Sequence, residues 1–169
     1  MIRMIRLLLI SAVLIANFAS AAELTEQQRV ALQTAQNFIT AFEQRDAEKA
    51  LAYIREDTVL EMPYPLFPGE GKYGTRRVTG EALRTYMRGI PVRNSQIAFT
   101  AKVWRVGNDS DVILEANGNL VRADGTPYRN KYIMVFHIED GRIASWREYF
   151  NPVVAARTFG IPLESLPGE

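Results

Sequence analysis

Apolar and polar residues alternate along the second half of the chain, as they do in strands whose two faces meet different surroundings. The alternation covers residues 95–106, 111–121 and 127–150, with polar turns between the three runs. Asp140-Gly141 divides the last run, and an Asp-Gly pair between apolar segments is the strongest short-range signal for a β-hairpin. The pattern predicts a four-stranded antiparallel meander.

Helical spacing of apolar residues dominates the first half of the chain. A first helix is predicted from Thr25, whose spacing to Gln28 matches a capping box. A shorter helix follows Asp46, a suitable N-cap. A third helix begins at Thr79 or the following glycine, and we expect Pro91 to end it.

Two connecting segments lie between the second and third helices. Residues 58–62 form a short β-rich run, and residues 63–75 contain three prolines and three glycines, which exclude regular structure. Because the loop also carries aromatic and aliphatic residues, it covers either the core or a site. Residues 152–159 are predicted to form a short last helix.

Helices followed by a β-meander indicate an α+β fold. We expect the N-terminal helices to pack on the concave face of a curved antiparallel sheet. Such a cone is open at one end, which is the general form of a small-molecule pocket.

The first 22 residues have the composition of a secretory signal peptide. Arg3 and Arg6 precede an apolar run over residues 7–18, which is followed by Ala19-Ser20-Ala21. A membrane anchor is the alternative, but this run is shorter than the roughly 20 apolar residues that a spanning helix needs. We therefore expect cleavage, a single mature domain over residues 23–169, and a periplasmic or secreted protein.

Composition narrows the classes of partner. Without the signal peptide the chain carries 18 basic and 19 acidic residues and no basic stripe, so neither nucleic acid nor a membrane is expected as a partner. The chain has no cysteine, and its single histidine stands in no cluster with metal-ligand spacing. No glycine-rich phosphate loop follows a strand. We expect neither a metal nor a cofactor.

Glu148 is the most informative candidate for chemistry. Alternation places it on the same strand face as Trp146 and Phe150, and a buried charge is costly unless it is paired or protonated. If Glu148 lies in an apolar cone, its pKa rises and it can transfer a proton near neutral pH. The alternative is a structural carboxylate paired with Arg76 or Arg77.

On the preceding strand, Asn130, Tyr132 and Phe136 share one face, and we expect them to line the cone or fill its core. His137 has the opposite parity, which predicts an outer-face or subunit-contact role.

Several motifs resemble the SnoaL-like branch of the NTF2-like (cystatin-cone) superfamily. They are Val78 to Leu83 (VTGEAL), Tyr128 to Tyr132 (YRNKY), Asp140 to Ile143 (DGRI) and Trp146 to Pro152 (WREYFNP). The resemblance includes phenazine-biosynthesis and limonene-epoxide hydrolase branches, although the strand carrying Glu115 departs from the epoxide hydrolase pattern.

The resemblance also implies roles for residues that alternation alone leaves open. Glu148 matches an acidic position where relatives place a catalytic acid or base, and Glu115 resembles a glutamate of the phenazine branch. Asn117 is expected inside the cone with Glu115. Independently of the resemblance, Glu61 is expected at the mouth of the cone and Tyr64 as a residue that lines it, both in contact with the ligand. For Glu115 and Asn117, the polar alternation of the strand by itself supports a solvent-facing position nearly as well as a position inside the cone.

Two hypotheses about function follow. The first is an exported enzyme that binds a small, largely apolar ligand and performs cofactor-free acid–base chemistry: isomerisation, cyclisation, dehydration or hydrolysis. The second is a non-catalytic ligand-binding or dimeric assembly module. The resemblance further implies a homodimer formed through the convex sheet face, where Ile133 and Ile143 are expected to lie.

Overall fold

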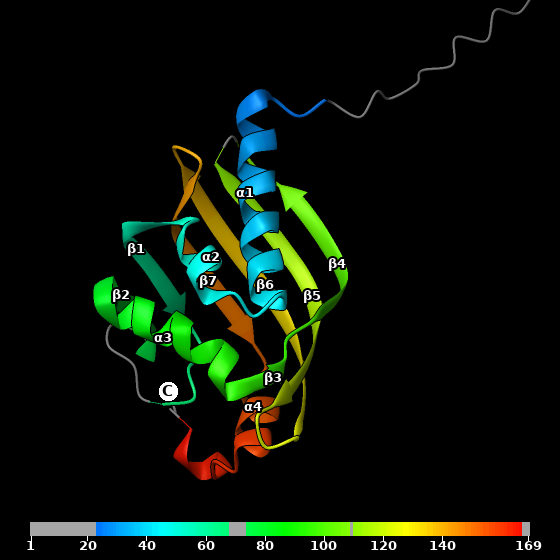
Figure 1. The fold of residues 1–169 in the computed structure, drawn as a ribbon. Coiled ribbons are helices and arrows are strands. Elements are labelled where there is room, and N and C mark those ends of the chain that lie inside the picture. Colours follow the sequence, from blue (N-terminus) through cyan, green and yellow to red (C-terminus); the bar gives the residue numbers. More distant parts are fainter. Residues whose placement is uncertain (1–22, 68–73, 109, 167–169) are drawn as a thin grey trace, which may run out of the picture.

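The computed structural model describes residues 23–67, 74–108 and 110–166 as four α-helices, a short 3-10 helix and one sheet (Figure 1). The expected signal peptide, residues 1–22, lies outside the described residues, as does the middle of the predicted loop, residues 68–73. In the described part of the chain, no helix combines the length and the apolar character needed to cross a bilayer.

The helices begin largely where the sequence predicts. They are α1 (Glu26–Glu43), α2 (Ala47–Leu51), α3 (Gly80–Arg93), α4 (Pro152–Phe159) and the 3-10 helix Leu163–Ser165. Thr25 and Gln28 form the expected capping box, and the Asp46 side chain accepts from the backbone N–H of Lys49.

Pro91 does not end the third helix, which corrects the sequence expectation. The helix α3 continues to Arg93 with Pro91 inside it. Side chains supply donors to the last carbonyls: Asn94 Nδ2 donates to the Ile90 carbonyl at 2.8 Å, and Arg45 Nη2 donates to the Pro91 carbonyl at 2.9 Å.

The sheet has seven strands in the order β2-β1-β7-β6-β5-β3, with β4 also paired to β5. The strands are β1 (Ile54–Met62), β2 (Arg76–Thr79), β3 (Asn94–Gln96), β4 (Phe99–Val106), β5 (Asp111–Arg122), β6 (Pro127–Glu139) and β7 (Arg142–Phe150). The predicted antiparallel meander is present as β4 to β7. Three features were missed: the parallel pairing of β1 with β7, the short strand β2 at the end of the loop, and the division of the predicted strand 95–106 into β3 and β4, which both pair with β5.

The core closes one end of the cone. The first helix α1 lies against the concave face of the sheet and packs on β4 to β7 (Figure 1). The Phe38 ring of α1 meets Phe136 and Trp146 edge-on, with ring centroids 5.9 and 5.3 Å apart. The third helix α3 packs on β1, β2 and β3, so the two long helices border the open part of the cone.

A register shift in the last hairpin corrects one placement. The pairing of β6 with β7 is irregular between His137 and Ile138, and Ile143 is fully buried rather than on the outer face. A bulge adds a residue to one strand and so reverses the alternation on one side of it. Beyond the bulge, Trp146 points inward as the sequence predicts.

Candidate functional site

A cavity of about 520 Å³ occupies the open part of the cone. Its volume is typical of sites for small molecules, and its walls are largely apolar. Aromatic side chains from several elements line it, among them Phe42, Phe99, Tyr132, Trp146, Phe150 and Phe159. Leu66 and Phe67 also reach the cavity, so the described start of the loop covers a site as well as a core.

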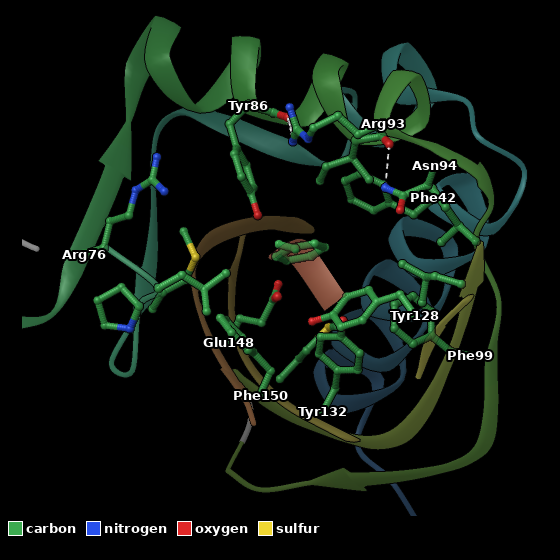
Figure 2. Close-up of a pocket in the computed structure, with 18 of the residues that line it drawn as sticks. Phe42, Arg76, Tyr86, Arg93, Asn94, Phe99, Tyr128, Tyr132, Glu148 and Phe150 are labelled. Carbon is green, nitrogen blue, oxygen red and sulfur yellow. Dashed lines mark hydrogen bonds between the residues drawn. The ribbon is translucent and has the colours of Figure 1, made fainter. Parts of the chain in front are cut away.

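Glu148 is the acidic residue of the cavity wall. It lies on β7 directly opposite Met134 of β6, and its carboxyl points into the cavity (Figure 2). Burial raises the pKa of Glu148 to about 7, and a hydrogen bond from the Trp146 side chain opposes that rise. The carboxyl is therefore half ionised near neutral pH.

No cation pairs with Glu148 among the residues that the structure describes. Arg77 instead lies 3.3 Å from Glu61, and Arg76 lies against the ring of Tyr86, 6.0 Å from its centroid. The structural alternative, a carboxylate held by Arg76 or Arg77, is therefore wrong for this geometry.

Three tyrosines supply hydroxyl groups to the same cavity. Tyr86 comes from α3, and its hydroxyl points toward the Glu148 carboxyl (Figure 2). Tyr128 and Tyr132 come from β6. Burial, with a smaller contribution from the charge of Glu148, raises the pKa of all three phenols. They therefore stay neutral across the working pH range and remain hydrogen-bond donors.

This set of groups suits proton transfer to and from a polarised ligand. A carboxyl with a pKa near 7 can take a proton and return it at neutral pH. A neutral phenol in an apolar site can donate to a ligand oxygen on which negative charge develops.

Four of the residues expected from the sequence do meet in the cavity. They are Tyr132, Trp146, Glu148 and Phe150. All four follow from strand alternation around the predicted hairpin.

Glu115 and Asn117 do not face the cavity, which corrects the placement implied by the resemblance. Both are exposed on β5, and Glu115 pairs with Arg105 of the neighbouring strand. Leu114 and Ala116 occupy the inward positions of β5. Since alternate side chains of a strand lie on opposite faces, Glu115 cannot share the cavity with them.

Glu61 and Tyr64 also lie outside the cavity. Glu61 lies between Arg77 and Arg147, 3.3 and 4.0 Å away, while its neighbour Met62 lines the cavity. The Tyr64 side chain is 61% exposed, and its ring centroid is 6.1 Å from that of Tyr149.

Asn130 and Phe136 are buried but do not line the cavity, and their contacts stabilise the fold. Asn130 donates to the Asn151 carbonyl and accepts from the Asn151 N–H, both at 3.0 Å, so it ties β6 to the start of α4. It also donates to the Tyr128 hydroxyl at 2.9 Å. Phe136 is fully buried against Phe38 below the cavity.

Sequence reasoning missed Tyr86 and Tyr128 as site residues. Tyr86 belongs to the apolar stripe of α3, and Tyr128 shares the inward face of β6 with Tyr132. A hydroxyl within an apolar stripe was the available signal in both cases. Arg93 also lines the cavity, and the sequence gave no signal for it.

His137 lies away from the cavity, as its parity predicts. Its Nδ1 is 2.8 Å from Asp111 and its Nε2 is 3.3 Å from Glu139. The hydrogen bond with Asp111 is the main cause that raises the pKa of His137. In residues 23–67, 74–108 and 110–166, no three His, Asp or Glu side chains gather as metal ligands would.

Comparison with known proteins gives consistent findings. A family profile described as the SnoaL-like domain matches residues 35–146. The uncharacterized protein YesE of Bacillus subtilis is 32% identical over 134 residues, which cover 77% of this chain and 87% of YesE.

Two solved structures have the same fold. One is an isomerase candidate from Bacillus subtilis, with a TM-score of 0.68 and 28% identity over 80% of this chain and 96% of its own. The other is a phenazine biosynthesis-related protein, PhzB2, from Pseudomonas aeruginosa. Its TM-score is 0.70 at 15% identity, covering 89% of this chain and 93% of its own.

Proposed function

We propose that this chain, which belongs to the SnoaL-like domain family, binds a small, largely apolar ligand in the cone and isomerises it by proton transfer through Glu148. The single observation that carries this proposal is the Glu148 carboxyl, which faces an aromatic cavity without a cationic partner among the described residues. The similarity to an isomerase candidate supports the same reaction class.

The reaction begins with the ionised form of Glu148. The carboxylate removes a proton from a ligand carbon adjacent to a carbonyl, and the electron pair of the C–H bond moves onto the carbonyl oxygen. The Tyr86 hydroxyl points toward the same space and donates a hydrogen bond to that oxygen (Figure 2). In a ligand with a C=C bond between its β- and γ-carbons, the electron pair returns from the oxygen through the conjugated enolate and the C=C bond shifts toward the carbonyl. Glu148 then returns the proton to the γ-carbon, which completes an isomerisation with no net change in atoms.

The tyrosines and the apolar walls make this chemistry favourable in two ways. The phenols remain protonated, because burial raises their pKa values. The aromatic walls exclude water, which strengthens each hydrogen bond in the cavity. A half-ionised Glu148 supplies both the base and its conjugate acid at neutral pH.

Solvent deuterium exchange tests the proposal without the natural substrate. 1-Tetralone and 2-acetylnaphthalene are incubated with the protein in D₂O, and loss of the proton next to the carbonyl is followed by ¹H NMR. We expect exchange above the buffer rate that Glu148→Gln abolishes, while ketone affinity stays within about tenfold, as for loss of a proton-transfer group alone. Glu115→Gln is the matched control, because it removes an exposed carboxylate on the other face of the sheet.

Binding of both ketones without exchange would contradict the catalytic part of the proposal. The cone would then serve a non-catalytic binding module, the second function considered from the sequence. Exchange that survives in Glu148→Gln would show that Glu148 is not the base.

Export and self-association extend the proposal. The expected signal peptide supports a periplasmic or secreted protein, and N-terminal sequencing of the mature chain after expression tests it. Ile133 and Val103 are each 46% exposed on the outer face of the sheet, which supports a homodimer through that face. Sedimentation at micromolar concentration tests the dimer, and a monomer there would contradict it.

A further inference from the structure

Two arginines border the cavity on the same side as Tyr86. Arg76 comes from β2 and Arg93 from the end of α3, and both are among the lining residues. Their guanidinium carbons lie 6.0 and 5.5 Å from the centroid of the Tyr86 ring. Two cations therefore share one aromatic ring at the border of a largely apolar hollow (Figure 2). Arg122 also lines the hollow, but it lies 3.5 Å from Asp124.

Neither arginine forms an ion pair with a carboxylate in the part of the chain that the structure describes. Other arginines of the described residues do pair with carboxylates, as Arg77 does with Glu61 and Arg88 with Glu48. The chain as a whole carries nearly equal numbers of acidic and basic residues. The positive charge at this border is thus a local feature of the cavity.

The two arginines are not among the causes that shift the pKa of Glu148. The pKa of Glu148 reflects burial and the Trp146 hydrogen bond, whereas both arginines act on the Tyr86 phenol. Tyr86 stands between the cations and the carboxyl, so the two charged regions are separated along its side chain (Figure 2). Figure 2 shows Arg76 and Arg93 on either side of Tyr86, so a ligand that spans this separation would meet their positive charge beside the Tyr86 ring and Glu148 at its other end.

The Arg93 guanidinium packs against α3 at Gly89, which has no side chain. A Cβ at Gly89 would overlap Arg93 Nη1, so the glycine leaves the room that the guanidinium occupies. Arg93 Nη2 also donates to the Tyr86 carbonyl at 3.3 Å. These contacts favour a position of the exposed Arg93 side chain beside the Tyr86 ring.

We infer that the ligand is an apolar or aromatic carboxylic acid, whose carboxylate is bound by Arg76 and Arg93 while its apolar body fills the cone beside Glu148. A guanidinium matches the planar geometry of a carboxylate and forms strong charge-assisted hydrogen bonds with it. This inference rests on the proposed function, because it names the class of ligand for the same cavity.

Matched pairs of acids and their methyl esters test the inference. The probes are 2-naphthoate, 4-phenylbutanoate and indole-3-propionate, each compared with its methyl ester by calorimetry at about pH 6, where carboxylic acids are ionised and Glu148 is largely protonated. At least one acid should bind about tenfold more tightly than its ester, as expected for charge-assisted hydrogen bonds. Added salt should reduce the difference.

Variants assign the preference to the two arginines. Arg76→Gln combined with Arg93→Gln should remove the preference for the acid and leave ester affinity unchanged. Arg77→Gln is the matched control, because Arg77 is exposed and pairs with Glu61. Gly89→Ala should also reduce acid binding, because its methyl group displaces the flexible end of Arg93 without a clash in the core.

The possible results separate this inference from the proposed function. Esters that bind as tightly as the acids, or an acid preference that survives in the double variant, would overturn the inference. Either result would still be consistent with binding of a small apolar ligand in the cavity. Failure of all six compounds to bind would contradict both. Circular dichroism of each variant confirms that an altered affinity is not the result of misfolding.

Discussion

The hydroxyl of Tyr86 on α3 and the carboxyl of Glu148 on β7 point toward one another across the cavity (Figure 2). The charge of Glu148 is one cause of the raised pKa of Tyr86, after burial. A neutral donor thus faces a carboxyl that is half ionised near pH 7. The pair arises because α3 covers the part of the cone that α1 leaves open.

The stability of the protein should depend on pH through Glu148. The Glu148 pKa is about 7 in the folded protein against 4.5 in the unfolded chain, so the folded state binds the proton more tightly between these values. The free energy of unfolding should therefore fall as pH rises from about 4.5 to about 7 and then level off, by about 3 kcal/mol from this group.

Urea unfolding of the wild type and Glu148→Gln at about pH 5 and pH 8 measures this dependence. The variant stays uncharged and should lose less stability over the same interval. His137 also has a raised pKa and contributes a fall in the same direction, so the difference between the two proteins isolates Glu148. Equal losses in both proteins would contradict the assignment.

Tyr86→Phe should remove the cavity's preference for a ligand with a carbonyl group. In the wild type, 2-acetylnaphthalene should bind more tightly than 2-ethylnaphthalene by about fivefold, since one net hydrogen bond contributes about 1 kcal/mol. The variant should bind the two compounds equally. Tyr64→Phe is the control, because that phenol is 61% exposed outside the cavity. A preference that persists in Tyr86→Phe would assign the donor to Tyr128 or Tyr132.

Gly118→Ala should destabilise the fold through Tyr132. A Cβ at Gly118 would lie 2.5 Å from Cε2 of the Tyr132 ring, and a buried ring moves at the expense of its packing. We expect a loss of about 1–3 kcal/mol in urea unfolding, typical of overpacking. Gly107→Ala should cost much less, because its nearest neighbour would be at an ordinary 3.5 Å.

A double variant shows whether the loss arises at the Tyr132 ring. Combining Gly118→Ala with Tyr132→Leu should cost less than the sum of the two single changes, because the leucine leaves room for the added methyl group. Additive losses would place the cause elsewhere in β5.

Asn130→Ala and Asn117→Ala separate a structural amide from a solvated one. Asn130 is buried and bonds to both backbone groups of Asn151, so its loss should cost about 1–3 kcal/mol for each group left unsatisfied. Asn117 is exposed, and its removal should change stability by less than about 0.5 kcal/mol. Similar effects of the two substitutions on urea unfolding would contradict these placements.

The hairpin of β6 and β7 shows what the sequence could predict. Alternation on either side of Asp140-Gly141 placed Tyr132, Trp146, Glu148 and Phe150 on one inward face, and the structure confirms that placement. Local periodicity was sufficient because the strands are long and one face of each is buried.

Other parts of the site depend on contacts that local patterns do not encode. The parallel pairing of β1 with β7 joins distant segments and turns Glu61 away from the cavity. The inward position of Glu115 was inferred from resemblance against its alternation with Leu114 and Ala116, and the alternation was the correct guide. The approach of Arg76 and Arg93 to Tyr86 depends on how α3 packs over the sheet.

The titration of Glu148 is the most direct test of whether this carboxyl can transfer a proton near neutral pH. Protein labelled with ¹³C at the glutamate side-chain carboxyl carbon is followed by NMR from about pH 3 to pH 9, a range that spans ordinary and raised carboxyl pKa values. Comparison with Glu148→Gln assigns the resonance. We expect one carboxyl that titrates at about pH 7 and is absent from the variant. A Glu148 resonance that titrates near its ordinary value of 4.5 would show that the carboxyl is fully ionised at neutral pH and would contradict its proposed role.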